Sequence, residues 1–570
     1  MVLSKNSELI FKKRYAIHKD ETWQELADRV GKGGAQVEKD FIEWGEAFSE
    51  DIYEMRFLPG GRILRNVGRP RGTLFNCYVE PLEDSMRQIG QFQMNCGILW
   101  SEGGGVGCNA SFLRPENAPI VQKGGESSGP ISFLKWANAG ADTIKVGGSR
   151  RAAALALMNV SHPDIIKFIN AKLVEGELDC FNISVGVTED FLQAVEANGN
   201  WDLEWKNKTW ETVKARDIWD LILTNMVNCA EPGLINWDNL RSNNSYYFDP
   251  IISTNPCGEV PLGAHGVCCL GSLVLPNFIT GTRNTNWQLM EKTVHNSIRF
   301  LDNIIQINKY VIEDVKQKAF DGRRIGLGIM GLAEYLFVKG VRYGSRESIR
   351  VITRLMENIR NYAYEASCNL AKEKEPFPKF DVKEFSKAHF FKTLPASLRM
   401  DIKKHGIRNV SVMAVAPTGT ISLLPEVSSS IEPLFCKSYL RHDEISDRAY
   451  IHPKYKEILE SGEPAPDWYV DSYDLKPEDH FETQVAVQKY LDGAVSKTIN
   501  CPKGFKKEQL SDLLLEYIRD LKGVTLYVDG SREGQILNPL NEEETRKHLE
   551  TLFFHTDQSE QECTTGKCDI

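Results

Sequence analysis

The sequence of 570 residues lacks any apolar run that approaches the roughly 20 residues of a membrane-spanning helix. Its first residues, MVLSKNSELIFKKRYAIHKDE, are charged throughout and carry no apolar core of a secretion signal. Internal repeats and long low-complexity linkers are also absent. These absences predict a cytoplasmic globular protein without a membrane partner.

Positive charge is in deficit. The 68 Lys and Arg residues are outnumbered by 78 Asp and Glu residues, which gives a formal net charge of −10. An acidic balance argues against nucleic acid as a partner, but it is compatible with nucleotides, which backbone amides and a few side chains can hold. A hydrophobic fraction of 42% is enough for a sizeable core and excludes general disorder.

The common nucleotide-binding signatures are missing, because no Walker A loop and no dinucleotide fingerprint occurs. Three glycine-rich stretches could still offer backbone amides to a phosphate: 101–109, 145–153 and 416–422. The best candidate is the last, APTGTIS, which surrounds Gly419 with hydroxyl side chains. For any one stretch a plain loop is an equally good interpretation, whereas all three together favour a nucleotide-binding protein.

Histidines are few and show no ligand spacing, so the sequence predicts no metal site. The pair Arg150–Arg151 follows two glycines and could bind an anion, although a solvated surface pair is as good a reading.

Cysteine is not scarce: there are 13, an odd number scattered along the chain, which does not resemble a secreted disulfide scaffold. The stretch NPCGE places Asn255, Cys257 and Glu259 on alternate residues. If the stretch is extended, the three side chains face one way, and a thiol between an amide and a carboxylate suits hydrogen-atom and proton transfer. A turn with a structural cysteine is the alternative, and spacing alone favours it.

Two further thiols, Cys563 and Cys568, lie in the polar stretch that ends the sequence. Two thiolates do not complete a tetrahedral metal site, and no histidine is near them. Thiol–disulfide exchange needs access and mobility, so we expect a flexible redox tail rather than an incidental pair.

Hydrophobic patterning predicts a helical region over residues 1–70, with a break at Gly33–Gly34, and then an α/β domain. Strands are expected within 73–79, 181–187, 408–417 and 523–531, and long amphipathic helices within 294–317 and 346–373. The polar stretch 437–495 is expected to form surface helices and loops, or an insertion.

Several of these residues together resemble a known family, the catalytic chains of ribonucleotide reductases. The resemblance rests on six co-linear motifs: FNCYVEPLEDS (75–85), NPCGEVPL (255–262), RRIGLGIMGLAEYL (323–336), APTGTISLL (416–424), DGAVSKTIN (492–500) and TLYVDGSREGQIL (525–537). It implies a ten-stranded α/β barrel with a central finger loop, over residues 71–550, between the helical region 1–70 and a redox tail 551–570.

The resemblance also implies roles for the thiols and their neighbours. Cys257 would become the thiyl radical that removes the ribose 3′ hydrogen. Glu259 would act as base toward the 3′ hydroxyl, and Asn255 would orient the substrate. Cys77 and Cys268 would reduce the 2′ carbon and end as a disulfide, with the adjacent Cys269 as the alternative partner. Cys563 and Cys568 would then reduce that disulfide, fed by thioredoxin or glutaredoxin.

Binding residues follow from the same resemblance. The substrate would contact Asn76 and the phosphate loop, namely Ala416, Pro417, Thr418, Gly419, Thr420 and Ser422. Specificity effectors, deoxynucleoside triphosphates or ATP, would contact Asp84, Ser85, Arg150 and Arg151 at the interface of a homodimer.

Within the family the match is closest to the adenosylcobalamin-dependent, class II branch, acting on ribonucleoside diphosphates. The four-residue spacing of CTTGKC looks more like class I, whose large subunit needs a small radical-generating partner. Class I chains, however, need a tyrosine pair where this chain has Tyr527 followed by Val528. No glycyl-radical motif occurs near the end of the sequence. No D-x-H-x-x-G motif identifies the residues that would contact the cobalamin.

Overall fold

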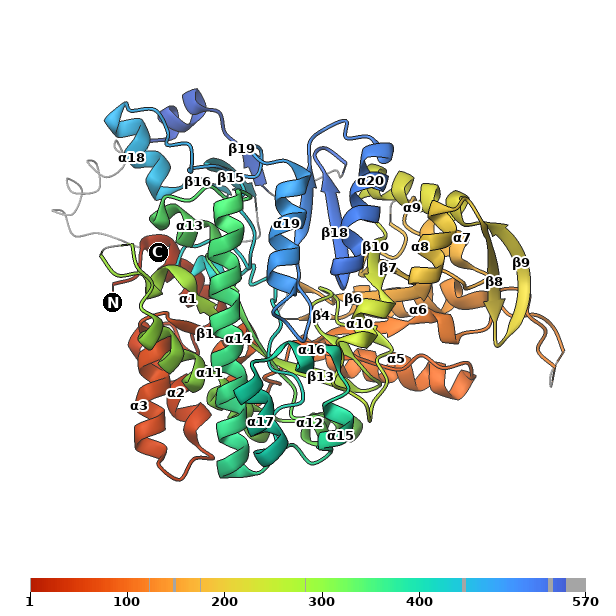
Figure 1. Cartoon of the computed structure of the whole chain (residues 1–570), viewed down its shortest axis with the longest axis horizontal. Coiled ribbons are helices and arrows are strands. Elements are labelled where there is room, and N and C mark those ends of the chain that lie inside the picture. Colours follow the sequence, from red (N-terminus) through yellow and green to blue (C-terminus); the bar gives the residue numbers. More distant parts are fainter. Residues whose placement is uncertain are drawn as a thin grey trace, which may run out of the picture.

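The computed structural model describes residues 2–549 except 122–123, 147–149, 175, 282, 443–446 and 532–536. The predicted redox tail, with Cys563 and Cys568, lies outside the described residues. Figure 1 shows the whole chain with its elements labelled.

The central feature is one sheet of ten strands, as the resemblance predicted. Five of them run parallel to one another: β2 (Cys77–Val79), β3 (Gly105–Asn109), β6 (Ala154–Asn159), β7 (Phe181–Val187) and β10 (Gly233–Asn236). A second set contains β13 (Gly266–Val274), β14 (Ile325–Met330), β17 (Thr498–Cys501) and β18 (Gly523–Val528). β13 lies antiparallel to β2, and β18 lies antiparallel to β10, so the two sets meet at both borders. The short β1 (Phe57–Pro59) adds to β13 from outside.

The sheet closes through the segment around residues 413–415, which falls inside the predicted strand 408–417. Parallel bridges pair Leu327 with Met413 and Val415 with Val495, just before β17. The segment forms bridges rather than a regular strand. A closed ring of strands leaves no long exposed edge and surrounds a space that loops can enter.

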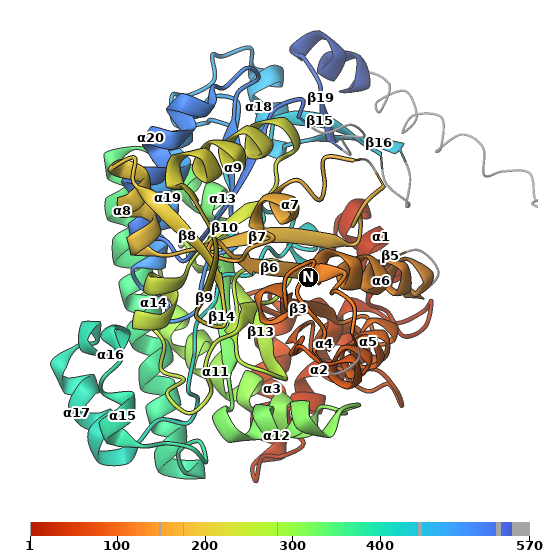
Figure 2. The same cartoon turned by 90° about the vertical axis from the view of Figure 1, so that its right-hand side faces the viewer.

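Helices cover the outside of the barrel. The two predicted amphipathic stretches form α11 (Trp287–Ile307), α12 (Glu313–Gly322) and α14 (Arg346–Lys374). In Figure 1, α14 runs alongside α19 (Pro477–Gln488), and α11 packs against α14. The far side carries α5 (Met86–Ser101), α6 (Gly129–Thr143), α8 (Glu189–Glu196), α9 (Ala215–Cys229) and α20 (Lys507–Tyr517). Figure 2 shows β6 and β7 side by side, with the hairpin β8 (Asn200–Trp205) and β9 (Lys208–Lys214) outside them.

The N-terminal region is helical, as expected, and contains α1 (Lys5–Arg14), α2 (Trp23–Ala35) and α3 (Phe41–Tyr53). The predicted break at Gly33–Gly34 is confirmed to within two residues, because α2 includes both glycines and ends at Ala35. A Cβ atom at Gly33 would lie 2.2 Å from Val67 Cγ1, and one at Gly34 would lie 2.3 Å from Phe300 Cε2. These glycines therefore permit close packing in the last turn of the helix.

The expectation for 437–495 is also wrong in part. The stretch does contain surface elements: β15 (Ser438–His442), β16 (Asp447–Ile451) and α18 (Pro453–Ser461). In α19, however, His480 and Phe481 are fully buried, because this helix packs against α14. Its polar residues His480, Thr483, Gln484 and Gln488 are therefore part of the interior, whereas Glu478 and Glu482 are exposed.

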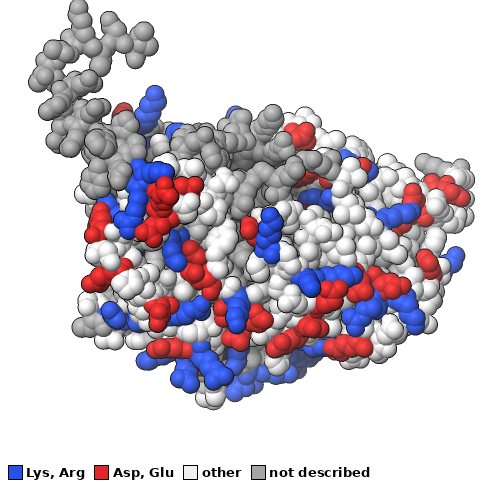
Figure 3. Space-filling view, turned by 90° about the horizontal axis from the view of Figure 1, so that it is seen from above, with Lys and Arg blue, Asp and Glu red and all other residues white. Residues whose placement is uncertain are grey.

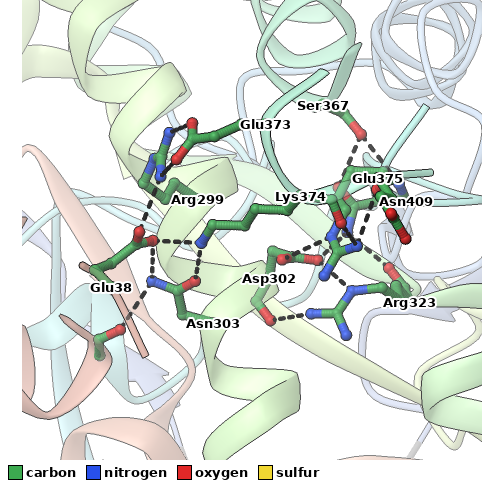
Figure 4. A network of polar contacts seen from close by, with 12 residues as sticks. Glu38, Arg299, Asp302, Asn303, Arg323, Ser367, Glu373, Lys374, Glu375 and Asn409 are labelled. Carbon is green, nitrogen blue, oxygen red and sulfur yellow. Dashed lines mark hydrogen bonds and ion pairs between the residues drawn. The ribbon is translucent and has the colours of Figure 1, made fainter. Parts of the chain in front are cut away.

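Charged groups tie the N-terminal helices to the barrel (Figure 4). Glu38, just after α2, binds Arg299 of α11 at 3.0 Å and Lys374 of α14 at 2.6 Å. Asp302 of α11 is fully buried and binds Arg323 at 2.7 Å and Arg408 at 3.2 Å. Because burial of an unpaired charge is costly, such a network fixes how these elements meet.

The surface has no field of one sign on the face seen from above, where acidic and basic side chains alternate (Figure 3). No helix in the described part of the chain is long and apolar enough to cross a membrane.

Candidate active site

A hairpin enters the barrel from β11 (Ser253–Thr254) and returns through β12 (Pro261–Leu262). Its tip is a turn, closed by a hydrogen bond from the Gly258 amide to the Asn255 carbonyl at 3.0 Å, with Gly258 at φ +81°. NPCGE therefore forms a turn, as its spacing favoured, and not the extended stretch that was the alternative. Asn255 and Glu259 are buried on the stem side, and Cys257 is exposed at the tip.

The hairpin packs tightly against β3. A Cβ atom at Gly107 would lie 1.8 Å from the Thr254 carbonyl oxygen, and one at Gly105 would lie 2.9 Å from the Pro256 ring. The glycine-rich stretch 101–109 was expected to be a loop, but from Gly105 onward it is strand β3. Here the glycines make room for the hairpin.

Polar contacts join the hairpin to Cys77 of β2. The Asn255 side-chain amide donates to Glu259 Oε2 at 2.8 Å and to Cys77 Sγ at 3.2 Å. The Cys77 thiol lies 4.0 Å from Glu259 Oε1 and can donate to it. The Val260 amide donates to Asn255 Oδ1 at 2.9 Å, which fixes the orientation of the Asn255 amide. An amide, a carboxyl group and a thiol are thus held together.

Burial controls the protonation of this cluster. It raises the pKa of Glu259 to about 7, against a smaller opposing effect of the hydrogen bond from Asn255. Burial, followed by the nearby Glu259 charge, raises the pKa of Cys77 well above its usual range. Near neutral pH the site therefore holds a protonated thiol beside a carboxyl group that can both take up and release a proton.

The second thiol of the predicted pair lies directly across from Cys77. Cys268 of β13 is the register partner of Cys77 of β2, and both belong to one small apolar cluster inside the barrel. The adjacent Cys269 belongs instead to the main core on the other face of β13. Since side chains alternate along a strand, only one of the two adjacent thiols can face Cys77.

A cavity of about 510 Å³ opens over these groups. Its lining includes the predicted residues Cys257, Asn255, Glu259, Cys77 and Asn76, together with Ala416, Pro417, Thr418, Gly419 and Thr420. Ser422 does not line it: the side chain is buried and its hydroxyl lies 3.0 Å from that of Ser429.

The turn at 417–420 has a left-handed residue at Thr418, with φ +52°, and not at the neighbouring glycine. The Thr418 hydroxyl accepts a hydrogen bond from the Ser430 amide at 2.7 Å, which holds this conformation. Gly419 and Thr420 are exposed at the edge of the cavity.

This cavity is also lined by four cations that were not predicted from the sequence. Lys13 and Arg14 of α1, and Arg62 and Arg65 of α4 (Gly61–Asn66), also line it. These residues lie far from the motifs in sequence, and only the packing of the N-terminal helices brings them to the barrel. For Lys13 and Arg14 the run FKKRY was a signal, since it ends a helix with three cations.

A second cavity, of about 600 Å³, adjoins the first at Gly419. Its lining is rich in aromatic residues, including Phe435, Tyr439, Tyr450 and Tyr527. Val528, which follows Tyr527, is buried. This cavity could accept a large, flat group beside the one that contains Cys257.

Of the predicted effector residues, Asp84 and Ser85 do not line these two cavities. Asp84 binds Arg114 at 3.0 Å, and the Ser85 hydroxyl caps α5 by accepting from the Gln88 amide. Arg150 and Arg151 form β5, which pairs with β4 (Lys145–Val146), but their side chains lie outside the described part of the chain. Their role stays a prediction.

One group of side chains could hold a metal ion, although no metal site was predicted. Ligand atoms of Glu291 and His295 on α11 and of Glu365 on α14 lie within 4.8 Å of one another. All three are at least partly exposed, and they are outside the two cavities.

Comparison with known families agrees with this geometry. Residues 75–527 match the ribonucleotide reductase barrel domain, and residues 1–72 match the ribonucleotide reductase all-alpha domain. A thiol-bearing hairpin inside an α/β barrel thus defines the class of enzyme, and the chain belongs to the ribonucleotide reductase family.

Curated relatives support the same family assignment. A vitamin B12-dependent ribonucleoside-diphosphate reductase of Mycobacterium tuberculosis is 34% identical over 94% of this chain and 81% of its own length. A protein of the same description from Thermoplasma acidophilum is 33% identical over 92% of this chain and 71% of its own length. A ribonucleoside-diphosphate reductase subunit alpha of Chlamydia trachomatis is 28% identical over 77% of this chain and 48% of its own length.

Proposed function

We propose that this protein reduces ribonucleoside diphosphates to 2′-deoxyribonucleotides by a thiyl-radical mechanism with adenosylcobalamin as cofactor. The observation that carries the proposal is the hairpin tip: exposed Cys257 shares a cavity with Asn255, Glu259 and Cys77. The vitamin B12-dependent relatives, similar over most of their length, support the choice of cofactor.

The cavity is suited to a nucleotide diphosphate. Four cations and the turn at 417–420 line it, and an anionic phosphate is attracted by both. We infer that the phosphates lie toward these groups and the ribose toward the hairpin. Holding the sugar in this way supplies the proximity that a radical reaction needs.

In the proposed reaction Cys257 acts as the thiyl radical and removes the 3′ hydrogen atom of the ribose. Glu259 takes the proton of the 3′ hydroxyl, and its pKa near 7 suits a base at neutral pH. Asn255 orients the substrate. The 2′ hydroxyl then leaves as water with one proton. Cys77 and Cys268 supply that proton, the hydrogen for the 2′ carbon and two electrons, and become a disulfide. Cys257 returns its hydrogen atom to the 3′ carbon, and Glu259 returns its proton to the 3′ oxygen.

Adenosylcobalamin, when bound, supplies the radical to Cys257. The residues present fit such a group, because Cys257 is exposed rather than buried and an aromatic-lined cavity adjoins its own. Phe435, Tyr439 and Tyr450 would hold the group there. The protein itself contributes binding, orientation and control of protons.

Renewal of the disulfide and regulation complete the proposal. Cys563 and Cys568 would carry electrons from thioredoxin or glutaredoxin, and the tail would begin near residue 551 after the barrel region 71–550.

Effectors would bind near Asp84 and Ser85 between two copies of the chain. The large apolar side chains exposed on the packed helices α5 and α6, such as Met94 and Trp136, support a homodimer. The free thiols of the described cysteines fit a reducing compartment such as the cytoplasm.

One assay tests the function. The purified chain is given cytidine diphosphate and a dithiol, with and without adenosylcobalamin, and deoxycytidine diphosphate is measured. We expect product only with the cofactor, and none from a Cys257→Ser variant. Product that instead requires a separate small radical-generating protein would assign the chain to class I. The spacing of CTTGKC is the observation that favours that alternative, and Val528 after Tyr527 argues against it.

A further inference from the structure

Arg324 is a buried cation without a carboxylate partner. It is 5% exposed, and no carboxylate oxygen of the described residues lies within ion-pair distance of it, whereas the adjacent Arg323 binds Asp302 at 2.7 Å. Its Nε atom is buried without a hydrogen-bond partner among the described residues. Its guanidinium carbon lies 4.0 Å from the centre of the Tyr246 ring. A buried charge held in this way calls for an explanation.

The register of two strands places Arg324 beside Cys268. In the parallel pair β13–β14, Cys269 is opposite Ile325 and Leu270 is opposite Gly326. One residue earlier, the same register brings Cys268 next to Arg324, and neighbouring strands lie about 4.8 Å apart. Side chains alternate along both strands, and Cys268 and Arg324 each precede the Cys269–Ile325 pair by one residue. The side chains of Cys268 and Arg324 therefore point to the same face of the sheet. A Cβ atom at Gly326 would lie 3.3 Å from Cys268 Sγ, so the thiol does point toward β14.

The two thiols of the pair therefore have opposite electrostatic surroundings. Cys77 lies 4.0 Å from the Glu259 carboxyl group and lines the cavity. Cys268 is 1% exposed and does not line that cavity. Burial raises the pKa of Cys268 above its usual range, Glu259 and Asp492 add to this effect, and the charge of Arg324 opposes it. Asp492 and Tyr246 also interact with Arg324, as do the buried Tyr364 and Lys522.

We propose that Arg324 is a positioning residue that stabilises Cys268 as the leaving thiolate when the Cys77–Cys268 disulfide is reduced. The proposal rests on the proposed function, which forms that disulfide at each turnover. A thiolate of the dithiol reductant attacks the accessible Cys77 sulfur. The new bond joins reductant and Cys77, the bond between Cys77 and Cys268 breaks, and its electron pair leaves on Cys268 beside Arg324.

The second thiolate of the dithiol then attacks the reductant sulfur of this mixed disulfide. Cys77 is released, the reductant becomes a disulfide, and both protein thiols take up protons from solvent. Two electrons have passed from the dithiol to the protein. Exchange is faster when the leaving thiol is more acidic, so loss of the positive charge slows the first attack.

The test compares Arg324→Met and Arg324→Lys in the full chain. The disulfide is formed with diamide, so the measurement does not depend on turnover, and its reduction by dithiothreitol is followed by quenching with iodoacetamide and peptide mass spectrometry. We expect the rate constant to fall about tenfold or more in Arg324→Met and to recover largely in Arg324→Lys, because the lysine keeps the charge.

Arg323→Lys is the matched control, since Arg323 is equally buried but contacts Asp302 on the other side of the strand (Figure 4). We expect its rate constant to equal that of the unchanged chain. The yield of deoxynucleotide in a single turnover of the pre-reduced holoenzyme should also be unchanged in Arg324→Met. A wild-type reduction rate in a folded Arg324→Met chain would overturn the proposal. If the rate constant for disulfide reduction fell equally in Arg324→Met and Arg324→Lys, Arg324 would have only a structural role, and the proposal would also be overturned.

The direction of attack gives a second test. Oxidised wild-type chain is treated with an excess of the monothiol 2-mercaptoethanol and acid-quenched, and the mixed disulfide is located by peptide mapping. We expect it on Cys77. A mixed disulfide on Cys268 would contradict the assignment of the leaving thiol. Absence of deoxynucleotide from the wild-type holoenzyme would refute the proposed function instead, and both disulfide measurements would still be interpretable.

Discussion

At the scale of single residues, burial decides the chemistry of Glu259. The side chain is 1% exposed, and burial raises its pKa to about 7 from an ordinary value of 4.5. Between these two pH values the folded protein holds a proton that the unfolded chain releases. The contribution of Glu259 to stability is therefore fully present below about pH 4.5 and is lost as pH rises through about 7.

Glu259→Gln tests this directly. The variant should be inactive, because an amide cannot accept the 3′ hydroxyl proton. It should gain stability over wild type as pH rises from 4.5 to 8, by at most about 3 kcal/mol, since one pKa unit corresponds to about 1.4 kcal/mol. Urea unfolding at several pH values measures the difference. A stability difference that does not vary with pH would contradict the raised pKa.

The adjacent thiols at 268 and 269 give a second prediction at this scale. Cys268→Ser should lower turnover with a dithiol by about 100-fold or more, because one of the two reducing sulfurs is lost. Cys269→Ser should keep turnover within about threefold, because its side chain packs in the main core rather than opposite Cys77. Steady-state assays of both variants decide, and loss of turnover in Cys269→Ser alone would reverse the assignment.

At the scale of elements, the position of the hairpin depends on glycine in β3. Gly107→Ala would place a methyl group 1.8 Å from the Thr254 carbonyl, so the hairpin or the strand must move. We expect a loss of activity of about 100-fold, because displacing reacting groups by about 1 Å costs that much. Gly281→Ala is the control, since nothing lies within 4 Å of its new Cβ atom. Equal activity of the two variants would contradict this packing.

Glycines in α2 and β3 show where local sequence patterns are a poor guide to secondary structure. Glycines are expected to break helices and to form loops, yet Gly33 and Gly34 lie within α2, and Gly105 and Gly107 lie within β3. In both places the missing Cβ atom makes room for a neighbour that is distant in sequence. In NPCGE, by contrast, the local sequence is a good guide, because the structure has the turn that the Asn-Pro and Cys-Gly pairs favour. The side chains of Asn255 and Glu259 are brought together by a hydrogen bond and not by alternation along a strand.

At the scale of the whole molecule, the buried ion network around Asp302 joins α11 to the segments before β14 and before the bridge at Met413 (Figure 4). Burial opposes the charge of Asp302, but Arg323 and Arg408 outweigh it and lower the pKa of the carboxyl group. Its contribution to stability is present above the pKa of the unfolded chain and is lost as pH falls through the lower folded value.

Asp302→Asn should destabilise the protein by about 3–5 kcal/mol at pH 7, because two buried guanidinium groups lose their partner. Glu373→Gln is the matched control: its carboxylate binds Arg299 but is about half exposed, and it should cost about 1 kcal/mol or less. Thermal unfolding of both variants gives the comparison. A small loss in Asp302→Asn would mean that the network does not hold these elements together.

The sequence by itself determined the α/β class, several of the strands and helices, and the family through its co-linear motifs. These features can be predicted from short stretches of sequence, because hydrophobic periodicity and short motifs depend on neighbouring residues. Only the tertiary structure decided which of Cys268 and Cys269 faces Cys77, that α1 and α4 bring four cations to the cavity, and that Arg324 lies beside Cys268. Each of these depends on strand register or on helix packing, which bring together residues that are far apart in the chain.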